Sequence, residues 1–282
     1  MKVNSLEQFK LEVNKALLAR DVNVVVEYQS LTFSYSSGNR RWQIRENNLL
    51  HCDWGPAAIY EDGTQEWYYK GQGHRTDGPA IIRPDGSEEW YYKGELHRER
   101  GPAIIRSDGS EEWYYEGLLH RIGDPAVIHS DGTKEWYCMG KRHRTDGPAV
   151  IHPDGSEEWW QFNRKHRVDA PAIIRANGSE EWWYMGYRHR LDGPAIVRSN
   201  GGEEWWKDGK RHRVGGPAVI RANGSEEWWF MGHPHRTDGP AIVEPDGTQK
   251  WYCMGVLHRT DGPAVIRQDG TEEWWQYGKK IK

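Results

Sequence analysis

The hydrophobic and polar positions of this chain follow one pattern that returns every 23 residues. An aliphatic run opened by proline, such as PAIIR (residues 79–83), leads into a turn of the form x-Asp-Gly or x-Asn-Gly, and an aromatic run such as SEEWYY (residues 87–92) follows. Proline can open a strand, and glycine supplies the positive φ that a tight turn requires. Each unit therefore predicts a β-hairpin whose two strands are the aliphatic and the aromatic run.

The repeat is regular along most of the chain. Ten prolines from Pro56 to Pro263 and ten tryptophans from Trp67 to Trp274 are each separated by 23 residues. We interpret the later glycine of the unit, Gly94 and its counterparts, as the end of the second strand, and the segment xxHRxD after it as a loop. The predicted fold is all-β: an elongated, single-layer antiparallel meander of ten tandem hairpins over residues 51–282, stabilised by contacts between neighbouring repeats.

One unit indicates the register of the hairpin. EPDGTQKW (residues 244–251) carries Glu244 where most units have arginine, and Lys250 where all others have glutamate. If the turn of another unit makes Arg83 face Ser87, then Arg83 and Glu89 are diagonal neighbours on one face. A paired reversal preserves such an ion pair, so we assign both charge columns to the scaffold. The same register predicts Ile82 opposite Glu88, Ile81 opposite Glu89 and Ala80 opposite Trp90.

Residues 1–50 differ from the repeats, and we expect them to cap the first sheet edge. The segment 4–20 predicts an amphipathic helix, with Ser5 and Gln8 in capping-box positions and Leu6, Phe9, Val13 and Leu17 on one face. VNVVVEYQ (residues 22–29) and LTFSYSS (residues 31–37) alternate as strands do, and residues 42–51 resemble a degenerate half-repeat.

Composition narrows the class of protein. Only 36% of residues are hydrophobic, yet 17 tryptophans and 14 tyrosines argue against disorder. A net charge of −4 gives no general attraction to nucleic acid or membranes. We expect a cytoplasmic protein, because three scattered cysteines favour reduced thiols and the sequence shows neither a signal peptide nor a membrane span.

Catalysis requires a unique set of residues, whereas nearly every polar residue here recurs about ten times. The sequence therefore predicts no enzyme and no cofactor. Histidines of successive repeats would lie roughly 9.6 Å apart, too far to share a metal ion. A recognition stripe is one interpretation of the recurring His-Arg pair. We favour a structural one, in which the pair ties down the joints between repeats.

The most variable positions are the two residues before each His-Arg pair, and in four central repeats these are basic or aromatic. With the adjacent arginines and the neighbouring tryptophans they form the candidate partner-binding site: Lys141, Arg142, Arg144, Trp160, Arg164, Lys165, Arg167, Trp183, Tyr187, Arg188, Arg190, Trp206, Lys210, Arg211 and Arg213. The cations would line one edge for roughly 30 Å. We expect a macromolecular partner with an acidic surface, in the first place a protein. A solvated edge that only keeps the chain soluble is the simpler interpretation.

Two other partners stay open. A nucleic-acid backbone would suit the basic edge, and an extended glycan would suit the aromatic column from Tyr68 to Trp275. Cross-strand packing is the commoner reason for such a column. Self-association through sheet edges is a less favoured alternative.

Tandem hairpins of 23 residues with Asp-Gly turns, a Trp/Tyr second strand, "GKRH" connections and "HRTDGPA" joints resemble the MORN-repeat family, and more closely its bacterial and viral variants. The resemblance covers residues 51–282, although eukaryotic MORN units carry more glycines. It implies an elongated sheet used for scaffolding and partner binding, with lipid contact proposed in some members. An inhibitor or antitoxin-like role is implied by the bacterial relatives alone, and no catalytic residues come with the resemblance.

Overall fold

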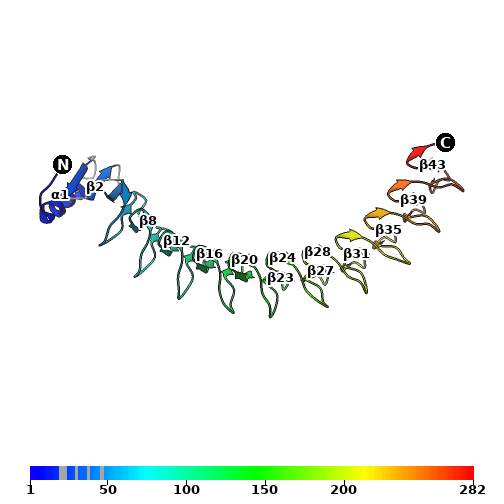
Figure 1. The fold of residues 1–282 in the computed structure, drawn as a ribbon, viewed down its shortest axis with the longest axis horizontal. Helices are drawn as coiled ribbons and strands as arrows, with labels where there is room; N and C mark the ends of the chain where they lie inside the picture. Colours follow the sequence, from blue (N-terminus) through cyan, green and yellow to red (C-terminus); the bar gives the residue numbers. More distant parts are fainter. Residues whose placement is uncertain (19–23, 29–30, 37–38, 45–47) are drawn as a thin grey trace. The chain divides into compact units, whose positions relative to one another are not determined.

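The computed structural model of the protein describes residues 1–18, 24–28, 31–36, 39–44 and 48–282. It divides the chain into two compact units, Met1–Lys141 and Arg142–Lys282. Both are antiparallel β-meanders built from the same repeat, and the first also carries the one helix of the described chain (Figure 1).

The helix α1 (Leu6–Leu18) begins where the capping residues predict. The Ser5 hydroxyl accepts the N–H of Gln8 at 3.1 Å, and Gln8 Oε1 accepts the N–H of Asn4 at 3.4 Å. Phe9 and Val13 are buried on the face that packs against β1 (Val24–Tyr28). The side chains of the other two predicted face residues, Leu6 and Leu17, lie outside the described part of the chain.

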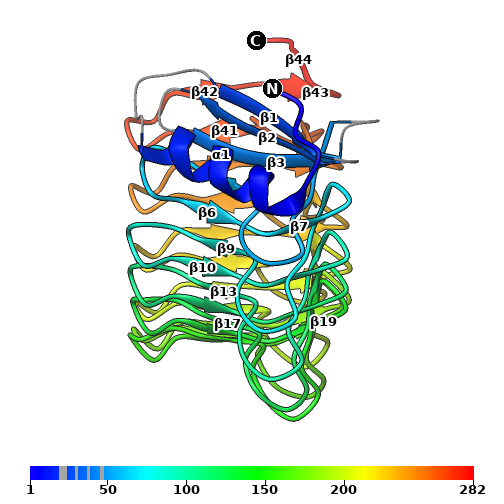
Figure 2. The same cartoon turned by 90° about the vertical axis from the view of Figure 1, so that its left-hand side faces the viewer.

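The N-terminal strands continue directly into the first repeat. Strand β1 pairs with β2 (Leu31–Ser36), and β2 pairs with β3 (Asn39–Ile44). Strand β3 pairs with β4 (Leu49–Leu50) and also with β5 (Ala58–Ile59), the first strand of the repeats. Figure 2 shows α1 lying across these strands at the start of unit 1. Predicted strand residues 22, 23, 29 and 37, and residues 45–47 of the half-repeat, lie outside the described residues.

The first hairpin of each repeat has the predicted register. Ile82 faces Glu88, and Ile81 faces Glu89. The Arg83 N–H donates to the Ser87 carbonyl at 2.9 Å, which closes the turn. Glu89 also faces Ile104 of the next repeat, so successive hairpins form a continuous meander within each unit.

The meander of unit 1 contains the following first-hairpin strands: β5, β6 (Gln65–Glu66), β9 (Ile81–Ile82), β10 (Glu88–Glu89), β13 (Ile104–Ile105), β14 (Glu111–Glu112), β17 (Val127–Ile128) and β18 (Lys134–Glu135). That of unit 2 contains β21 (Val150–Ile151), β22 (Glu157–Glu158), β25 (Ile173–Ile174), β26 (Glu180–Glu181), β29 (Ile196–Val197), β30 (Glu203–Glu204), β33 (Val219–Ile220), β34 (Glu226–Glu227), β37 (Ile242–Val243), β38 (Gln249–Lys250), β41 (Val265–Ile266) and β42 (Glu272–Glu273).

The second half of each repeat differs from the prediction. The aromatic run is not one strand, because the chain turns away from the meander at its tryptophan. Trp90 does not pair with Ala80: its N–H donates to the carbonyl of Ala103 in the next repeat at 2.7 Å, and its own carbonyl accepts the N–H of His97 at 3.0 Å. The residues that follow form a second hairpin, in which β11 (Tyr91–Tyr92) pairs with β12 (Glu95–Leu96).

The predicted loop xxHRxD therefore begins with a strand. The physical reason lies in the turn between the two strands. Lys93 and Gly94 have φ values of 50° and 86°, and two successive positive φ values define a type I′ hairpin turn. The glycine interpreted as a strand end is thus the second turn residue, and the chain folds back immediately after it.

The second hairpins recur at the same positions in later repeats (Figure 1). In unit 1 their strands are β7 (Tyr68–Tyr69), β8 (Gln72–Gly73), β11, β12, β15 (Tyr114–Tyr115), β16 (Leu118–Leu119) and β19 (Tyr137–Cys138), and β20 (Lys141–Arg142) contains the boundary between the units. In unit 2 they are β23 (Trp160–Gln161), β24 (Arg164–Lys165), β27 (Trp183–Tyr184), β28 (Tyr187–Arg188), β31 (Trp206–Lys207), β32 (Lys210–Arg211), β35 (Trp229–Phe230), β36 (His233–Pro234), β39 (Tyr252–Cys253), β40 (Val256–Leu257), β43 (Trp275–Gln276) and β44 (Lys279–Lys280).

The core is a line of small and aliphatic side chains rather than a deep interior. The alanine of each PA motif, such as Ala80 and Ala172, has no exposed surface. Ile173 and Val219, at the Ile81 position, are 1% exposed. By the alternation of the strands they share a face with the glutamate column, since Ile81 pairs with Glu89.

Candidate partner-binding site

The reversed charges of residues 244–251 form the ion pair that the sequence predicts. Lys250 Nζ donates to Glu244 Oε1. The normal orientation gives the same bond elsewhere: Arg83 Nη1 lies 2.6 Å from Glu89 Oε1. The reversal therefore preserves a scaffold contact within one hairpin.

In three of the four central joints, the second of the two residues before the His-Arg pair ion-pairs with this same glutamate column. Arg188 Nη2 lies 3.2 Å from Oε2 of Glu181. The other carboxylate oxygen of Glu181, Oε1, lies 3.0 Å from Arg175 Nη2. In the neighbouring repeats Arg211 lies 3.3 Å from Glu204, and Lys165 lies 3.8 Å from Glu158. These candidate cations are therefore already engaged within the protein.

The two arginines control the ionisation of the glutamate between them. Burial by itself would raise the pKa of Glu181. The hydrogen bond from Arg175 and the charge of Arg188 outweigh this effect, so the pKa lies below its usual value. Glu181 therefore stays ionised and keeps both guanidinium groups in place.

Cations and tryptophans alternate along this face in unit 2. Arg188 lies 4.9 Å from the ring centre of Trp183 and 5.4 Å from that of Trp206 in the next repeat. Lys165 lies between the rings of Trp160 and Trp183 in the same way, at 5.2 and 5.4 Å. The ladder continues with Arg142 over Trp160 and with Arg211 over Trp206 and Trp229.

The ring edges of the tryptophan column are also used, because Trp183 Nε1 donates to Glu181 at 3.1 Å. Trp160 and Trp206 make the equivalent bonds to Glu158 and Glu204. The aromatic column is thus held on its faces by cations and at its edges by carboxylates. This arrangement favours cross-strand packing over a stacking platform for a glycan.

The arginines of the His-Arg pairs tie down the joints. The Arg190 guanidinium lies 4.0 Å from the ring centre of Trp182 and donates to the carbonyl of Pro194 at 3.2 Å and to Asp192 at 3.0 Å. Arg144, Arg167 and Arg213 bond the equivalent proline carbonyls at 3.3, 3.1 and 3.0 Å. All four are half-buried.

The histidines stabilise the type I′ turns of the following repeat. His166 Nδ1 accepts the N–H of Met185, whose φ is 48°, at 3.2 Å. His212 accepts the N–H of Met231 at 3.4 Å. Burial lowers the pKa of both histidines, so the neutral, accepting form is favoured.

The first residue of each central joint lies beside the turn and is exposed. Lys141, at the end of unit 1, and Arg164 and Lys210 in unit 2 are exposed, and Tyr187 is 62% exposed. The structure thus divides the predicted site into an engaged inner column and a solvent-facing outer one. Tyr187 lies against the next turn, because a side chain at Gly209 would come within 3.0 Å of its ring.

Large apolar side chains that the sequence analysis missed lie at the same hairpin tips. Tyr184 pairs with Tyr187 across the hairpin and is 51% exposed, as is Phe162. We call eight of the exposed residues at these tips the hairpin-tip row of unit 2: Phe162, Arg164, Tyr184, Met185, Tyr187, Lys210, Phe230 and Met231. The later glycine of each repeat, Gly94 and its counterparts, is the sequence signal for these tips. If that glycine is taken as the second residue of a two-residue hairpin turn, the residues beside it lie at the tip of the second hairpin.

The described part of the chain contains no group of three or more His, Cys, Asp or Glu side chains placed to hold a metal ion. None of its helices has the length and apolar character that crossing a membrane requires. No protein-family model matches the sequence, and no curated protein is similar enough to be a recognisable relative.

Proposed function

We propose that this protein is a non-catalytic repeat scaffold that binds a protein partner with an acidic surface through the hairpin-tip row of unit 2. One observation carries the proposal: aromatic residues and methionine, 36 to 62% exposed, alternate there with the exposed cations Arg164 and Lys210. Tyrosine, methionine and arginine are enriched in protein interfaces, and tyrosine and arginine supply much of their binding energy.

A nucleic-acid backbone is a less suitable partner for this surface. Lys165, Arg188 and Arg211 are each paired with a carboxylate and held over indole rings. Binding to phosphates requires cations that are free to replace counterions. The outer cations alone would provide few such contacts, whereas a protein surface also covers the apolar tips.

The resemblance to MORN-like repeats supports scaffolding, and an inhibitor or antitoxin-like role rests on that resemblance alone. Cys52, Cys138 and Cys253 are free thiols, which supports the proposal of a cytoplasmic setting.

A matched pair of double variants tests the proposed surface. Tyr184→Ser with Tyr187→Ser removes two tip residues in unit 2. Tyr115→Ser with Leu118→Ser changes the equivalent cross-strand pair in unit 1, where exposure is 44 and 42%. Tyr115 lies between His97 and His120 much as Tyr184 lies between His166 and His189. Both variants should therefore perturb the fold similarly.

The protein that wild type captures from its source cells is identified, purified and titrated against both variants. We expect the unit 2 variant to bind about 100-fold or more weakly, and the unit 1 variant to bind as wild type does. Equal losses would contradict the proposal. A parallel titration with single-stranded and duplex DNA should show no strongly salt-dependent binding, and tight salt-dependent binding would favour the nucleic-acid alternative.

A further inference from the structure

A column of hydroxyl side chains links the turns of successive first hairpins. The position after the turn glycine is serine or threonine in nine of ten repeats, from Thr64 to Thr271. Ser87 Oγ accepts the N–H of Ser107, a turn residue of the next repeat, at 3.0 Å. Ser110, Ser156 and Ser179 accept the equivalent N–H groups at the same distance.

The serine hydroxyls of this column are matched to the turn N–H groups that follow them. Before two of the turns that carry proline, which has no N–H, the hydroxyl bonds within its own turn instead. Thr64, which precedes Pro84, donates to Asp62 at 3.0 Å, and Ser225, which precedes Pro245, donates to Asn223 at 2.9 Å. The serine of this position thus acts as the acceptor for a turn N–H one repeat further on.

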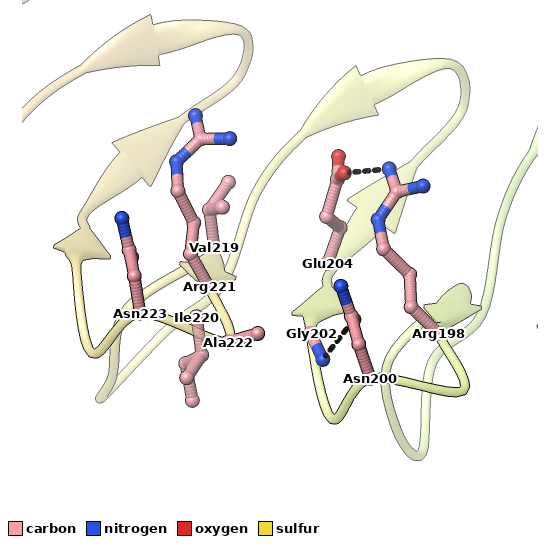
Figure 3. A pocket seen from close by; sticks show the side chains of 9 residues that line it. All are labelled: Arg198, Asn200, Gly202, Glu204, Val219, Ile220, Arg221, Ala222 and Asn223. Atoms are coloured by element: carbon pink, nitrogen blue, oxygen red, sulfur yellow. Dashed lines mark hydrogen bonds and ion pairs between the residues drawn. The ribbon is translucent and has the colours of Figure 1, made fainter.

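Gly202 interrupts the match. It is the one residue of the column without a hydroxyl, and the next turn offers an N–H at Ala222. Within the part of the chain that the structure describes, no group accepts this N–H. An open surface cavity of about 280 Å³ lies beside Gly202, between the two hairpins (Figure 3).

Most of the polar side chains that line the cavity offer hydrogen-bond donors, and the remainder of the lining is apolar. Asn200 Oδ1 accepts the N–H of Gly202 at 3.1 Å, and Asn223 Oδ1 accepts the N–H of Ser225 at 3.1 Å. Both amide oxygens are therefore used, and their NH₂ groups remain as donors. Most other turns carry aspartate at this position, so the asparagines also remove negative charge from the cavity.

Two arginines add a positive charge to the lining. Arg198 and Arg221 extend from successive repeats beside the cavity (Figure 3). Arg198 uses Nη2 for Glu204 at 2.6 Å, and Arg221 uses Nε and Nη2 for Glu227 at 3.0 and 2.5 Å. Each guanidinium keeps further N–H groups for a ligand. Arg211 also pairs with Glu204, so three arginines (Arg198, Arg211 and Arg221) against Glu204 and Glu227 leave a net charge of +1 around the cavity.

We propose that this cavity is a receptor for a carboxylate, one oxygen of which replaces the missing serine hydroxyl as acceptor for the Ala222 N–H. The single net positive charge suits a monoanion, and the convergent donors suit a group that only accepts. The carboxylate is supplied either by a free small acid or by an Asp or Glu side chain of the protein partner. The second source rests on the function proposed above, whereas the receptor itself does not.

The receptor is tested without any partner, by following backbone amide signals of the full chain in an NMR titration with sodium acetate. We expect a saturable shift of the Ala222 amide. The Ala176 amide occupies the same position two repeats earlier but already bonds Ser156, so it should not respond. Absence of a shift at Ala222, or an equal shift at Ala176, would overturn the proposal. A stronger response to phosphate at equal ionic strength would overturn the preference for a monoanion.

Gly202→Ser restores the common residue and closes the site. Gly202 does not have a positive φ, and a Cβ there would lie 3.3 Å from the side chains of Arg198 and Asn200, so serine is accommodated once these side chains shift by a few tenths of an ångström. This variant should move the Ala222 amide to a hydrogen-bonded shift and abolish its response to acetate. The converse variant, Ser179→Gly, should make the Ser199 amide respond. A retained acetate response at Ala222 in Gly202→Ser would contradict the assignment.

The same variant separates the two sources of the carboxylate. If the partner supplies it, Gly202→Ser should weaken partner binding about tenfold or more. Unchanged partner binding together with a lost acetate response would assign the receptor to a free acid and reject the partner as its source. Loss of partner binding in the tip variant alone would leave the receptor intact, so the two proposals fail separately.

Discussion

The ion pair between Glu244 and Lys250 allows the inferred register and scaffold role to be tested by exchanging charges. Glu244→Arg alone places two cations together, and Lys250→Glu alone places two carboxylates together. The double variant restores the orientation seen at Arg83 and Glu89. We therefore expect both single variants to be destabilised and the double variant to regain the stability of the wild type.

The expected magnitude follows from the exposure of the pair. The side chains of Glu244 and Lys250 are 35 and 27% exposed, so solvent screens them partly. A pair of this kind contributes about 0.3–0.5 kcal/mol. Each single variant exchanges attraction for repulsion of similar size, so the coupling energy of the full cycle sums four such contributions. This gives about 1–2 kcal/mol.

Hydrogen exchange is the appropriate assay, because a repeat protein opens locally and a global unfolding midpoint averages over the repeats. The amide of Glu244, which bonds the carbonyl of Thr248 at 2.9 Å, reports on this hairpin. A coupling of 1–2 kcal/mol corresponds to about 5- to 30-fold in exchange rate. The reasoning is refuted if the two single effects add in the double variant, since the charges would then act independently.

Three further predictions concern the turns and joints. Met185→Asn should raise the free energy of unfolding of unit 2 by about 0.5–1 kcal/mol in urea denaturation, because asparagine tolerates the positive φ better than methionine. A destabilised variant would show that the packing of the methionine side chain stabilises the fold by more than its backbone strain destabilises it. Asn163→Gly should lower the free energy of unfolding by about 0.5–1.5 kcal/mol, because it removes the 2.7 Å hydrogen bond from the Arg142 N–H to Asn163 Oδ1 while glycine permits the same backbone conformation. An unchanged urea midpoint would contradict this prediction. The urea midpoint should fall as the pH drops below about 6.5. Folding lowers the pKa values of His166 and His212, so their contribution to stability is complete above their ordinary pKa and is lost as pH falls through the folded-state pKa values. A midpoint independent of pH would show that the turn N–H groups do not depend on these histidines.

The fold class and the first hairpin follow from the sequence because the 23-residue period and the reversed charges at 244 and 250 constrain pairing directly. The second hairpin does not, because its strands are two residues long and leave no alternation to detect. In the sequence, only Gly94, the glycine after Lys93, indicates the second hairpin. A glycine at this point is equally compatible with the end of a strand, so it does not identify the turn. A positive φ at lysine is held by the preceding repeat, where His74 Nδ1 accepts the Lys93 N–H at 3.2 Å. A local sequence signal does not contain such a contact.

The sequence indicates which residue types gather at the candidate site, but it does not indicate the direction in which each side chain points. The sequence places Tyr187 and Arg188 side by side, yet strand alternation turns the tyrosine to solvent and the arginine to Glu181. Because the strand itself was not predicted, its two faces were not distinguished. The exposed neighbours Tyr184 and Met185 were missed for the same reason.

Photo-cross-linking at the hairpin tips tests directly whether the hairpin-tip row of unit 2 binds a protein partner. A photoreactive phenylalanine analogue replaces Tyr187 in one protein and Leu118 in another, since both begin the second strand of the second hairpin. On irradiation in the source cells, we expect position 187 to cross-link to one defined polypeptide with an acidic surface, and we expect position 118 not to do so. Equal cross-linking at both positions, none at either, or cross-linking of position 187 to nucleic acid would contradict this expectation.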